Sequence, residues 1–191
     1  MPPRRPRSAH RVPTGTSRVP SAAGPGALTA NERATFEAVA ARIWPGTDAD
    51  PGAREAGALD YLEGALAGPY RHMLRIYRDG LADLNRASTA RHGSLFAGLA
   101  DAEQDALLAA MDRNDLPEFT SMAPREFLTL CIDHTMEGIF SDPIHGGNRD
   151  FAGWRVVGYP GPQGGYSASE QVQMTPLQRP IRGLEIRGDE D

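Results

Sequence analysis

The sequence predicts an all-α domain, a bundle of about five helices followed by an irregular C-terminal strap rich in glycine, proline and aromatic residues. Three observations predict this fold. Apolar residues recur with the 3.6-residue period of a helix in five stretches between residues 29 and 142. Proline and glycine separate these stretches, and no alternating strand pattern occurs beyond the short run 155–157. Hydrophobic residues make up 40% of the chain, which is enough for a core.

The first helix is predicted over residues 29–43. Thr29-Ala30-Asn31-Glu32 fits a capping box, in which the Thr29 hydroxyl and the Glu32 carboxylate bind otherwise unpaired amides at a helix start. The apolar residues that follow recur at the spacing of one helix face: Phe36, Val39, Ala40 and Ile43. Trp44-Pro45-Gly46 then ends the helix.

The second and third helices are predicted over residues 53–67 and 70–87. Gly68-Pro69 separates them, because glycine and proline both interrupt a helix. The inward face of the second comprises Ala56, Leu59, Leu62, Ala65 and Leu66. That of the third comprises Tyr70, Met73, Leu74, Tyr77, Leu81 and Leu84.

The fourth helix is predicted to begin near Asp101, where Asp101-Ala102-Glu103-Gln104 fits a second capping box. Leu107, Leu108 and Met111 form its apolar stripe. The fifth helix begins near Pro124, since proline is favoured in a first turn, and ends at Asp142-Pro143. Its broad apolar face comprises Phe127, Leu128, Cys131, Ile132, Thr135 and Ile139.

After residue 142 the helical period disappears. Residues 143–166 contain ten glycines and prolines, with Phe151, Trp154, Tyr159 and Tyr166 among them. Aromatic residues in such a coil indicate an ordered strap on a surface. We therefore expect a basic, proline-rich, disordered tail over residues 1–27, a helical domain over 28–166 and a polar tail over 167–191.

Composition excludes several classes of function. Residues 1–27 carry five arginines and no acid, whereas the remainder has 15 arginines against 25 acidic residues. An acidic body argues against nucleic-acid binding, which needs a basic face. The single cysteine, Cys131, rules out an intrachain disulfide and cysteine-rich metal sites. No apolar run approaches the roughly 18 residues that a membrane span requires.

The residues around the end of the fifth helix form a distinctive motif. His134-Thr135-Met136-Glu137-Gly138 is followed by Phe140-Ser141-Asp142-Pro143-Ile144-His145-Gly146-Gly147-Asn148, then by Gly153-Trp154 and Gly158-Tyr159-Pro160-Gly161. This pattern resembles the gluconate 2-dehydrogenase subunit 3 family, the small subunits of bacterial flavin-dependent sugar and polyol dehydrogenases. The resemblance covers residues 29–162.

The resemblance implies a partner and a cofactor outside this chain. The large subunit would be a flavoprotein of the glucose-methanol-choline oxidoreductase class, which holds FAD and oxidises the sugar. The small subunit would bind it and be required for its folding, maturation or export. Some complexes add a haem c subunit. This chain has no dinucleotide fingerprint of its own.

Two features give conflicting indications of the cellular compartment of the protein. Arg4-Arg5 could open a twin-arginine export signal, but residues 12–27 contain no apolar region after it. The sequence therefore favours the cytoplasm. Many members of the family are exported, so the alternative is a periplasmic complex.

His134 and Glu137 share a helix face at i, i+3, with Asp142 and His145 close behind, and such a cluster could bind a metal. A di-iron bundle would need a second such pair, and none occurs. We interpret the two residues as hydrogen-bonding groups that pin the strap to the helix. We assign no catalytic, cofactor or metal residue; Cys131 is expected to be a buried core thiol.

The remaining motif residues have mechanical roles or contact a partner. Asp142-Pro143 forces the helix to end, and Gly146-Gly147-Asn148 suits a tight turn with positive φ angles. This turn either is purely structural or presses on the partner. Trp154 and Tyr159 either anchor an interface or close this domain's own core. We therefore expect partner-binding or structural residues at His134, Glu137, Phe140, Asp142, Pro143, Gly146, Gly147, Asn148, Trp154 and Tyr159.

Three functions remain at this point. The preferred one is a non-catalytic accessory subunit of a flavin-dependent sugar dehydrogenase. The alternative is a stand-alone helical metal-binding enzyme that uses His134 and Glu137. A helical scaffold for another partner is the third.

Overall fold

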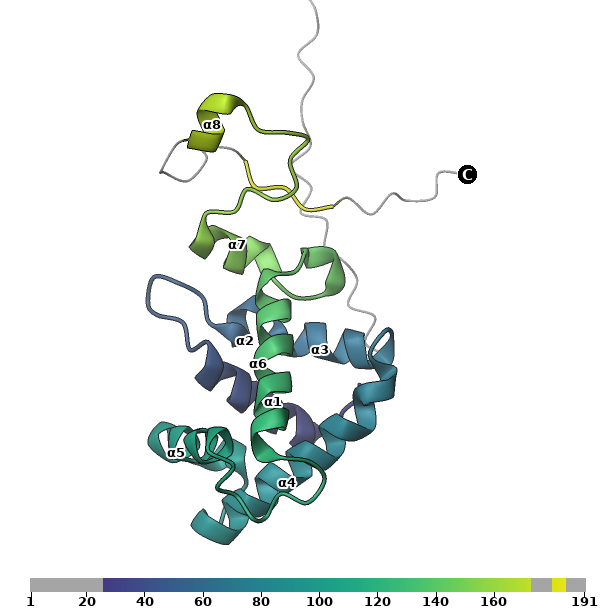
Figure 1. Cartoon of the computed structure of the whole chain (residues 1–191), viewed down its shortest axis with the longest axis vertical. Helices are drawn as coiled ribbons and strands as arrows, with labels where there is room; N and C mark the ends of the chain where they lie inside the picture. The colour runs from purple at the N-terminus through teal and green to yellow at the C-terminus, as the bar shows by residue number, and fades with distance from the viewer. Residues whose placement is uncertain (1–25, 173–179, 185–191) are drawn as a thin grey trace, which may run out of the picture.

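A computed structural model describes residues 26–172 and 180–184 of the chain, and in these residues all regular structure is helical (Figure 1). The all-α prediction is confirmed. The predicted tail over residues 1–27 lies almost wholly outside the described residues. The elements in chain order are α1 (Ala30–Ile43), α2 (Ala53–Ala56), α3 (Ala58–Ala67), η1 (Arg71–Met73), α4 (Leu74–His92), η2 (Phe96–Gly98), α5 (Asp101–Asp112), α6 (Pro124–Phe140), η3 (Pro143–His145), η4 (Arg149–Phe151), α7 (Ala152–Val157) and α8 (Ala168–Val172).

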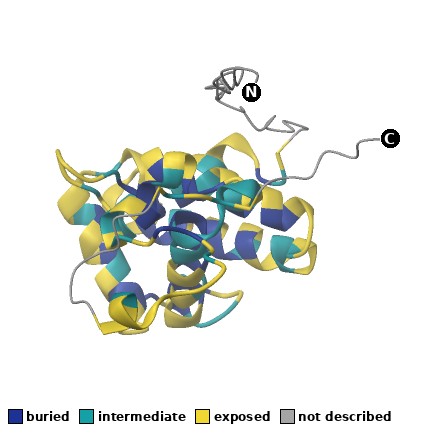
Figure 2. Ribbon diagram, turned by 90° about the horizontal axis from the view of Figure 1, so that it is seen from above, coloured by how far each residue is buried: buried dark blue, intermediate teal, exposed yellow. Residues whose placement is uncertain are grey.

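Helix α6 is the central element of the fold. It packs against α1, α2, α3, α4, α5 and α7, and in Figure 1 it runs down the middle of the molecule. Phe127, Cys131 and Ile139 on α6 are essentially inaccessible to solvent. Figure 2 shows the buried residues along the inward faces of the surrounding helices. No helix in the described ranges is long and apolar enough to cross a bilayer.

Two predicted helices differ from the structure in their boundaries. The predicted second helix is divided at Gly57, which has φ of +79° and separates α2 from α3. A glycine is tolerated there because only glycine adopts positive φ without steric cost. The predicted third helix starts with the 3-10 turn η1 and runs on to His92, where Gly93 ends it with φ of +75°.

Two finer expectations were wrong. Ala100, not Asp101, is the N-cap of α5, and the Glu103 carboxylate accepts from the Ala100 amide at 3.1 Å. A capping box with alanine as cap keeps only the half that the glutamate supplies. Ile132, predicted on the apolar face of α6, is 39% exposed. Cys131, which precedes it, and Thr135, about one turn later, are buried in the core as predicted.

The predicted strap is more regular than its composition suggests. Residues 143–157 contain the 3-10 turns η3 and η4 and the short helix α7, which includes the run 155–157. Helix α7 is too short to show a helical period, and it contains Gly153 and is followed by Gly158. It forms because Ala152, Gly153 and Trp154 are buried against the end of α6.

Glycines allow α6 to approach its neighbours closely. A Cβ at Gly138 would lie 2.8 Å from the Ala58 Cα on α3, and a Cβ at Gly80 on α4 would meet the Phe127 ring of α6 at distances down to 2.4 Å. A larger residue at either position would push the helices apart. These two glycines therefore set the distances from α6 to α3 and α4.

We predict that Gly138→Ala destabilises the protein. Overpacking of this kind costs about 1–3 kcal/mol, which outweighs the roughly 1 kcal/mol by which alanine favours a helix over glycine. Thermal or urea unfolding of the two proteins measures the difference. Gly64→Ala is the matched control, since Gly64 is exposed on α3 and the nearest atom to its Cβ is 4.0 Å away. Equal effects of the two substitutions would contradict the packing argument.

Candidate functional site

Three tyrosines surround the predicted pair His134 and Glu137, and the five residues form a tyrosine–carboxylate cluster. Tyr61 comes from α3, Tyr77 from α4, and Tyr70 precedes η1. The Tyr70 ring lies over the His134 ring at a centroid distance of 4.9 Å. The interpretation that His134 and Glu137 pin the strap is therefore wrong. Both residues bind groups from the α3–α4 region instead.

His134 is buried at the inner side of this cluster. The Tyr77 hydroxyl donates to the Leu130 carbonyl at 3.1 Å, and its oxygen lies 2.5 Å from the His134 Nδ1 in a second hydrogen bond. Burial lowers the pKa of His134, and the nearby Glu137 and Asp133 carboxylates oppose this effect in part. Burial also raises the pKa of the Tyr77 hydroxyl. The pair is therefore neutral and structural at neutral pH.

Glu137 lies at the outer side of the cluster and is half-buried. Its Oε2 accepts from the Tyr61 hydroxyl at 2.7 Å, and the Tyr70 hydroxyl is 3.3 Å from the same oxygen. Burial and the hydrogen bond to Glu137 both raise the pKa of Tyr61. The two hydroxyls hold the carboxylate in place without neutralising its charge.

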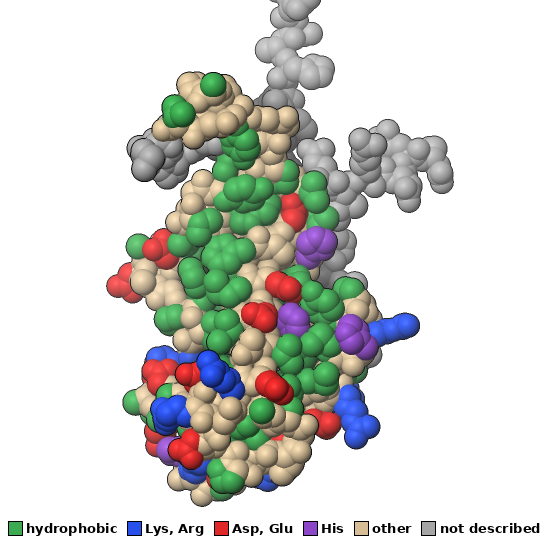
Figure 3. Space-filling model, viewed as in Figure 1, with side chains coloured by type: hydrophobic (Ala, Val, Ile, Leu, Met, Phe, Trp, Pro, Cys, Tyr) green, Lys and Arg blue, Asp and Glu red, His purple; other side chains and the backbone are tan. Residues whose placement is uncertain are grey.

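A surface hollow opens beside Glu137, and we call it the α6 hollow. It is lined by Tyr61, Asp133, Met136, Glu137, Phe140 and Ser141. Figure 3 views the molecule from this side and shows acidic and hydrophobic side chains together over α6, with arginine side chains mainly toward the lower end. The predicted residues Glu137 and Phe140 thus share a surface with Asp133 and Tyr61.

Two of the remaining predicted residues, Asn148 and Trp154, cap the end of α6. A helix leaves its last carbonyl groups without partners inside the helix. Here the Asn148 amide donates to the Gly138 carbonyl at 2.6 Å, and the Asn148 side chain donates to the Ser141 carbonyl at 2.8 Å. The Trp154 indole donates to the Phe140 carbonyl at 2.7 Å. Residues of the motif thus supply donors that the helix end lacks.

Two glycines allow this close approach. A Cβ at Gly147 would lie 2.1 Å from the Gly138 carbonyl oxygen, and a Cβ at Gly153 would lie 2.2 Å from the Ile139 carbonyl oxygen. Gly146 ends η3 with φ of +94°. The Asn148 Oδ1 accepts from the Gly153 amide at 2.9 Å. Because the same side chain donates to the Ser141 carbonyl, it joins both ends of the turn. No larger residue fits at positions 147 and 153.

Asp142 and Pro143 begin the turn as predicted. Asp142 caps η3, because its Oδ1 accepts from the Ile144 amide at 3.1 Å. Its Oδ2 accepts from the Leu184 amide at 2.6 Å, which fixes part of the C-terminal segment to the end of α6. Both carboxylate oxygens are therefore used within this chain.

Trp154 closes this domain's own core, being only 4% exposed. Its ring stacks with Phe151 and meets the Tyr159 ring edge-on at a centroid distance of 5.0 Å. Tyr159 is 39% exposed, so one side of its ring faces solvent. Trp154 is thus a core residue, and Tyr159 lies on the surface.

The alternative function, a metal-binding enzyme, requires a set of metal ligands, and the described part of the chain contains none. No group of three or more His, Cys, Asp or Glu side chains is placed to hold a metal ion in residues 26–172 and 180–184. Cys131 is fully buried, and burial raises the pKa of its thiol, as expected of a core cysteine.

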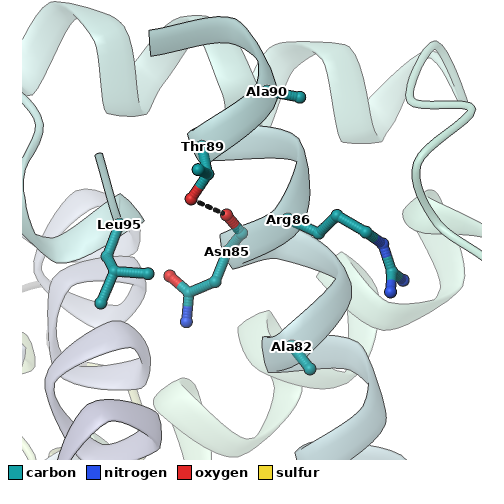
Figure 4. A pocket seen from close by; sticks show the side chains of 6 residues that line it. All are labelled: Ala82, Asn85, Arg86, Thr89, Ala90 and Leu95. Atoms are coloured by element: carbon teal, nitrogen blue, oxygen red, sulfur yellow. Dashed lines mark hydrogen bonds between the residues drawn. The ribbon is translucent and has the colours of Figure 1, made fainter. Parts of the chain in front are cut away.

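A second hollow lies on α4 and is drawn in Figure 4. Its lining residues are Ala82, Asn85, Arg86, Thr89, Ala90 and Leu95. Asn85 donates to the Thr35 hydroxyl at 2.9 Å and accepts from the Phe96 amide at 3.1 Å. The Thr89 hydroxyl donates to the backbone carbonyl of Asn85. Because these polar groups serve the fold, the hollow offers no evident chemistry.

Sequence reasoning missed Tyr61 and Asp133 as site residues. Tyr61 stands on a short, mostly apolar helix, 76 positions before Glu137. No local spacing relates two residues so far apart. Asp133 could have been found, since it precedes Glu137 by one helical turn.

The chain matches a known family over most of its length. The family model for gluconate 2-dehydrogenase subunit 3 matches residues 30–161, from the first residue of α1 to just beyond α7. The resemblance seen in the motif is thereby confirmed. No curated protein and no solved structure showed a significant match.

We predict that His134 makes the stability depend on pH. Burial lowers the pKa of the folded-state imidazole, so the unfolded chain binds a proton first as pH falls. The free energy of unfolding is highest above the ordinary histidine pKa of about 6.5 and decreases as pH falls toward the lower folded-state value. Urea unfolding over this range measures the slope. His134→Gln should flatten it, whereas the exposed His72→Gln should not. An unchanged slope in His134→Gln would refute the assignment.

We predict that Asn148→Ala lowers the free energy of unfolding by about 2–4 kcal/mol, since one buried and one half-buried backbone group lose their partners. Those groups are the Ser141 carbonyl and the Gly153 amide. Asn31→Ala is the control, because Asn31 is exposed in the first turn of α1. Chemical denaturation compares the variants, and a loss no larger than that of the control would show that the cap is dispensable.

Proposed function

Since the chain belongs to the gluconate 2-dehydrogenase subunit 3 family, we propose that it is a non-catalytic small subunit. It binds and stabilises, or helps to mature, an FAD-dependent sugar or gluconate dehydrogenase of the glucose-methanol-choline class. The large subunit holds the FAD and oxidises the substrate. The family match over residues 30–161 carries this proposal, because it spans nearly the whole described helical body.

The use of the motif residues supports a non-catalytic role. Asn148 and Trp154 donate hydrogen bonds to the end of α6, and Asp142 accepts from two backbone amides. Catalytic acids and bases must instead reach a substrate. The motif residues Asp142, Asn148 and Trp154 therefore stabilise the fold of this chain.

The surface from the last residue of α7 onward supports a role in binding a protein. Eight large hydrophobic side chains are exposed in the described residues, and five of them follow residue 156: Val157, Tyr159, Tyr166, Val172 and Leu184. Figure 1 shows this segment, with α8, extending away from the helical body. Five large exposed apolar side chains within one stretch of the chain make that stretch a candidate contact surface.

Co-expression tests this function. We predict that the large subunit expressed alone gives several-fold less soluble, FAD-loaded and active enzyme than the large subunit expressed with this chain. Soluble yield, FAD absorbance per polypeptide and sugar oxidation with an artificial electron acceptor are the readouts. Co-expression with Asn148→Ala should fall between the two, because that chain folds less stably.

A large subunit that is soluble, FAD-loaded and fully active without this chain would contradict the proposal. So would failure of the two chains to purify together when both are folded.

A further inference from the structure

Glu137 is unusual among the carboxylates of the described residues. Every other buried or half-buried Asp or Glu there accepts from an arginine or a backbone amide. Glu137 binds only the hydroxyls of Tyr61 and Tyr70. Its negative charge is therefore fixed in position and is not neutralised by any described residue.

Asp133 adds a second negative charge to the same hollow. It precedes Glu137 by one turn of α6, and like charges at this spacing repel one another. No arginine of the described residues pairs with either carboxylate. Elsewhere arginines bridge helices, as Arg42 does to Asp105 of α5 and Arg149 to Asp60 of α3.

The apolar walls determine what can cover this hollow. Met136 and Phe140 line it beside the two acids, so a partner gains free energy by burying them. Covering them also removes water from Glu137, and a buried carboxylate without a cation is strongly unfavourable. A partner that brings a positive charge to Glu137 avoids this cost.

We propose that the α6 hollow is the docking site for an arginine side chain of the flavoprotein large subunit. This inference rests on the proposed function. Arginine fits better than lysine because its planar guanidinium pairs with a carboxylate through two parallel hydrogen bonds and stacks on aromatic rings. Glu137 supplies the carboxylate, and Tyr61 and Phe140 supply rings at the wall of the hollow.

The test is the dissociation constant of the FAD-loaded complex that forms when the large subunit is co-expressed with the full-length chain or one of its variants, measured by dilution at low and high NaCl. We expect Glu137→Gln to weaken binding about tenfold or more and to reduce its salt dependence. Glutamine can still accept from Tyr61, so the free chain should keep its unfolding temperature. Asp133→Asn, which breaks no described hydrogen bond, should weaken binding less but in the same direction.

Asp48→Asn is the matched control, since it removes one exposed charge in the loop between α1 and α2. Equal dissociation constants for Glu137→Gln, Asp133→Asn and Asp48→Asn would overturn the inference while leaving the proposed function intact. Failure of the wild-type chain to bind the large subunit would instead overturn the proposed function.

The chain's own N-terminal arginines are the competing occupant. A full-length chain with Arg4→Gln, Arg5→Gln, Arg7→Gln, Arg11→Gln and Arg18→Gln distinguishes the two. If the large subunit supplies the arginine, this chain binds as wild type and Glu137→Gln still weakens it. If Glu137→Gln loses its effect in that background, the tail occupies the hollow and the inference fails.

Discussion

The last carbonyl groups of α6 need hydrogen-bond donors, and this need determines how the chain continues after the helix. The segment that follows α6 covers these carbonyl groups, so their hydrogen-bond donors must come from the chain itself. Asn148 and Trp154 provide those donors to the Gly138, Phe140 and Ser141 carbonyls. The chain must therefore turn back immediately after α6 and cross its end, and glycines 147 and 153 are required for the close approach.

This capping also positions the surface that faces outward. With α6 fixed at its end and packed on α3 through Gly138, Glu137 meets Tyr61 across the helix pair. The cluster has a neutral inner half, in which His134 binds Tyr77, and a charged outer half at Glu137. The motif thus combines a structural cap with a neighbouring carboxylate that no described residue neutralises.

Much of the fold could be predicted because it follows from local patterns. The apolar periods of α1, α4 and α6, the Thr29 cap and the stop at Asp142-Pro143 all depend on residues within a few positions of one another. The division at Gly57 was not predicted, because a glycine inside a helical pattern can also continue the helix. Helix α7 was not predicted, because its burial against the end of α6 is a contact between separate segments. Ile132 shows the same limit, because a broad apolar face does not reveal which of its edges a neighbour covers.

The spacing of residues along the chain identified the helical class, the family and the importance of the residues from His134 to Tyr159, because such spacing is a local property. Only the tertiary structure separated their roles. It assigned Asn148 and Trp154 to the cap of α6, and it placed Glu137 beside Tyr61 on the surface. The reason is physical: a hydrogen bond between residues 76 positions apart depends on how two helices pack, and no local pattern records that packing.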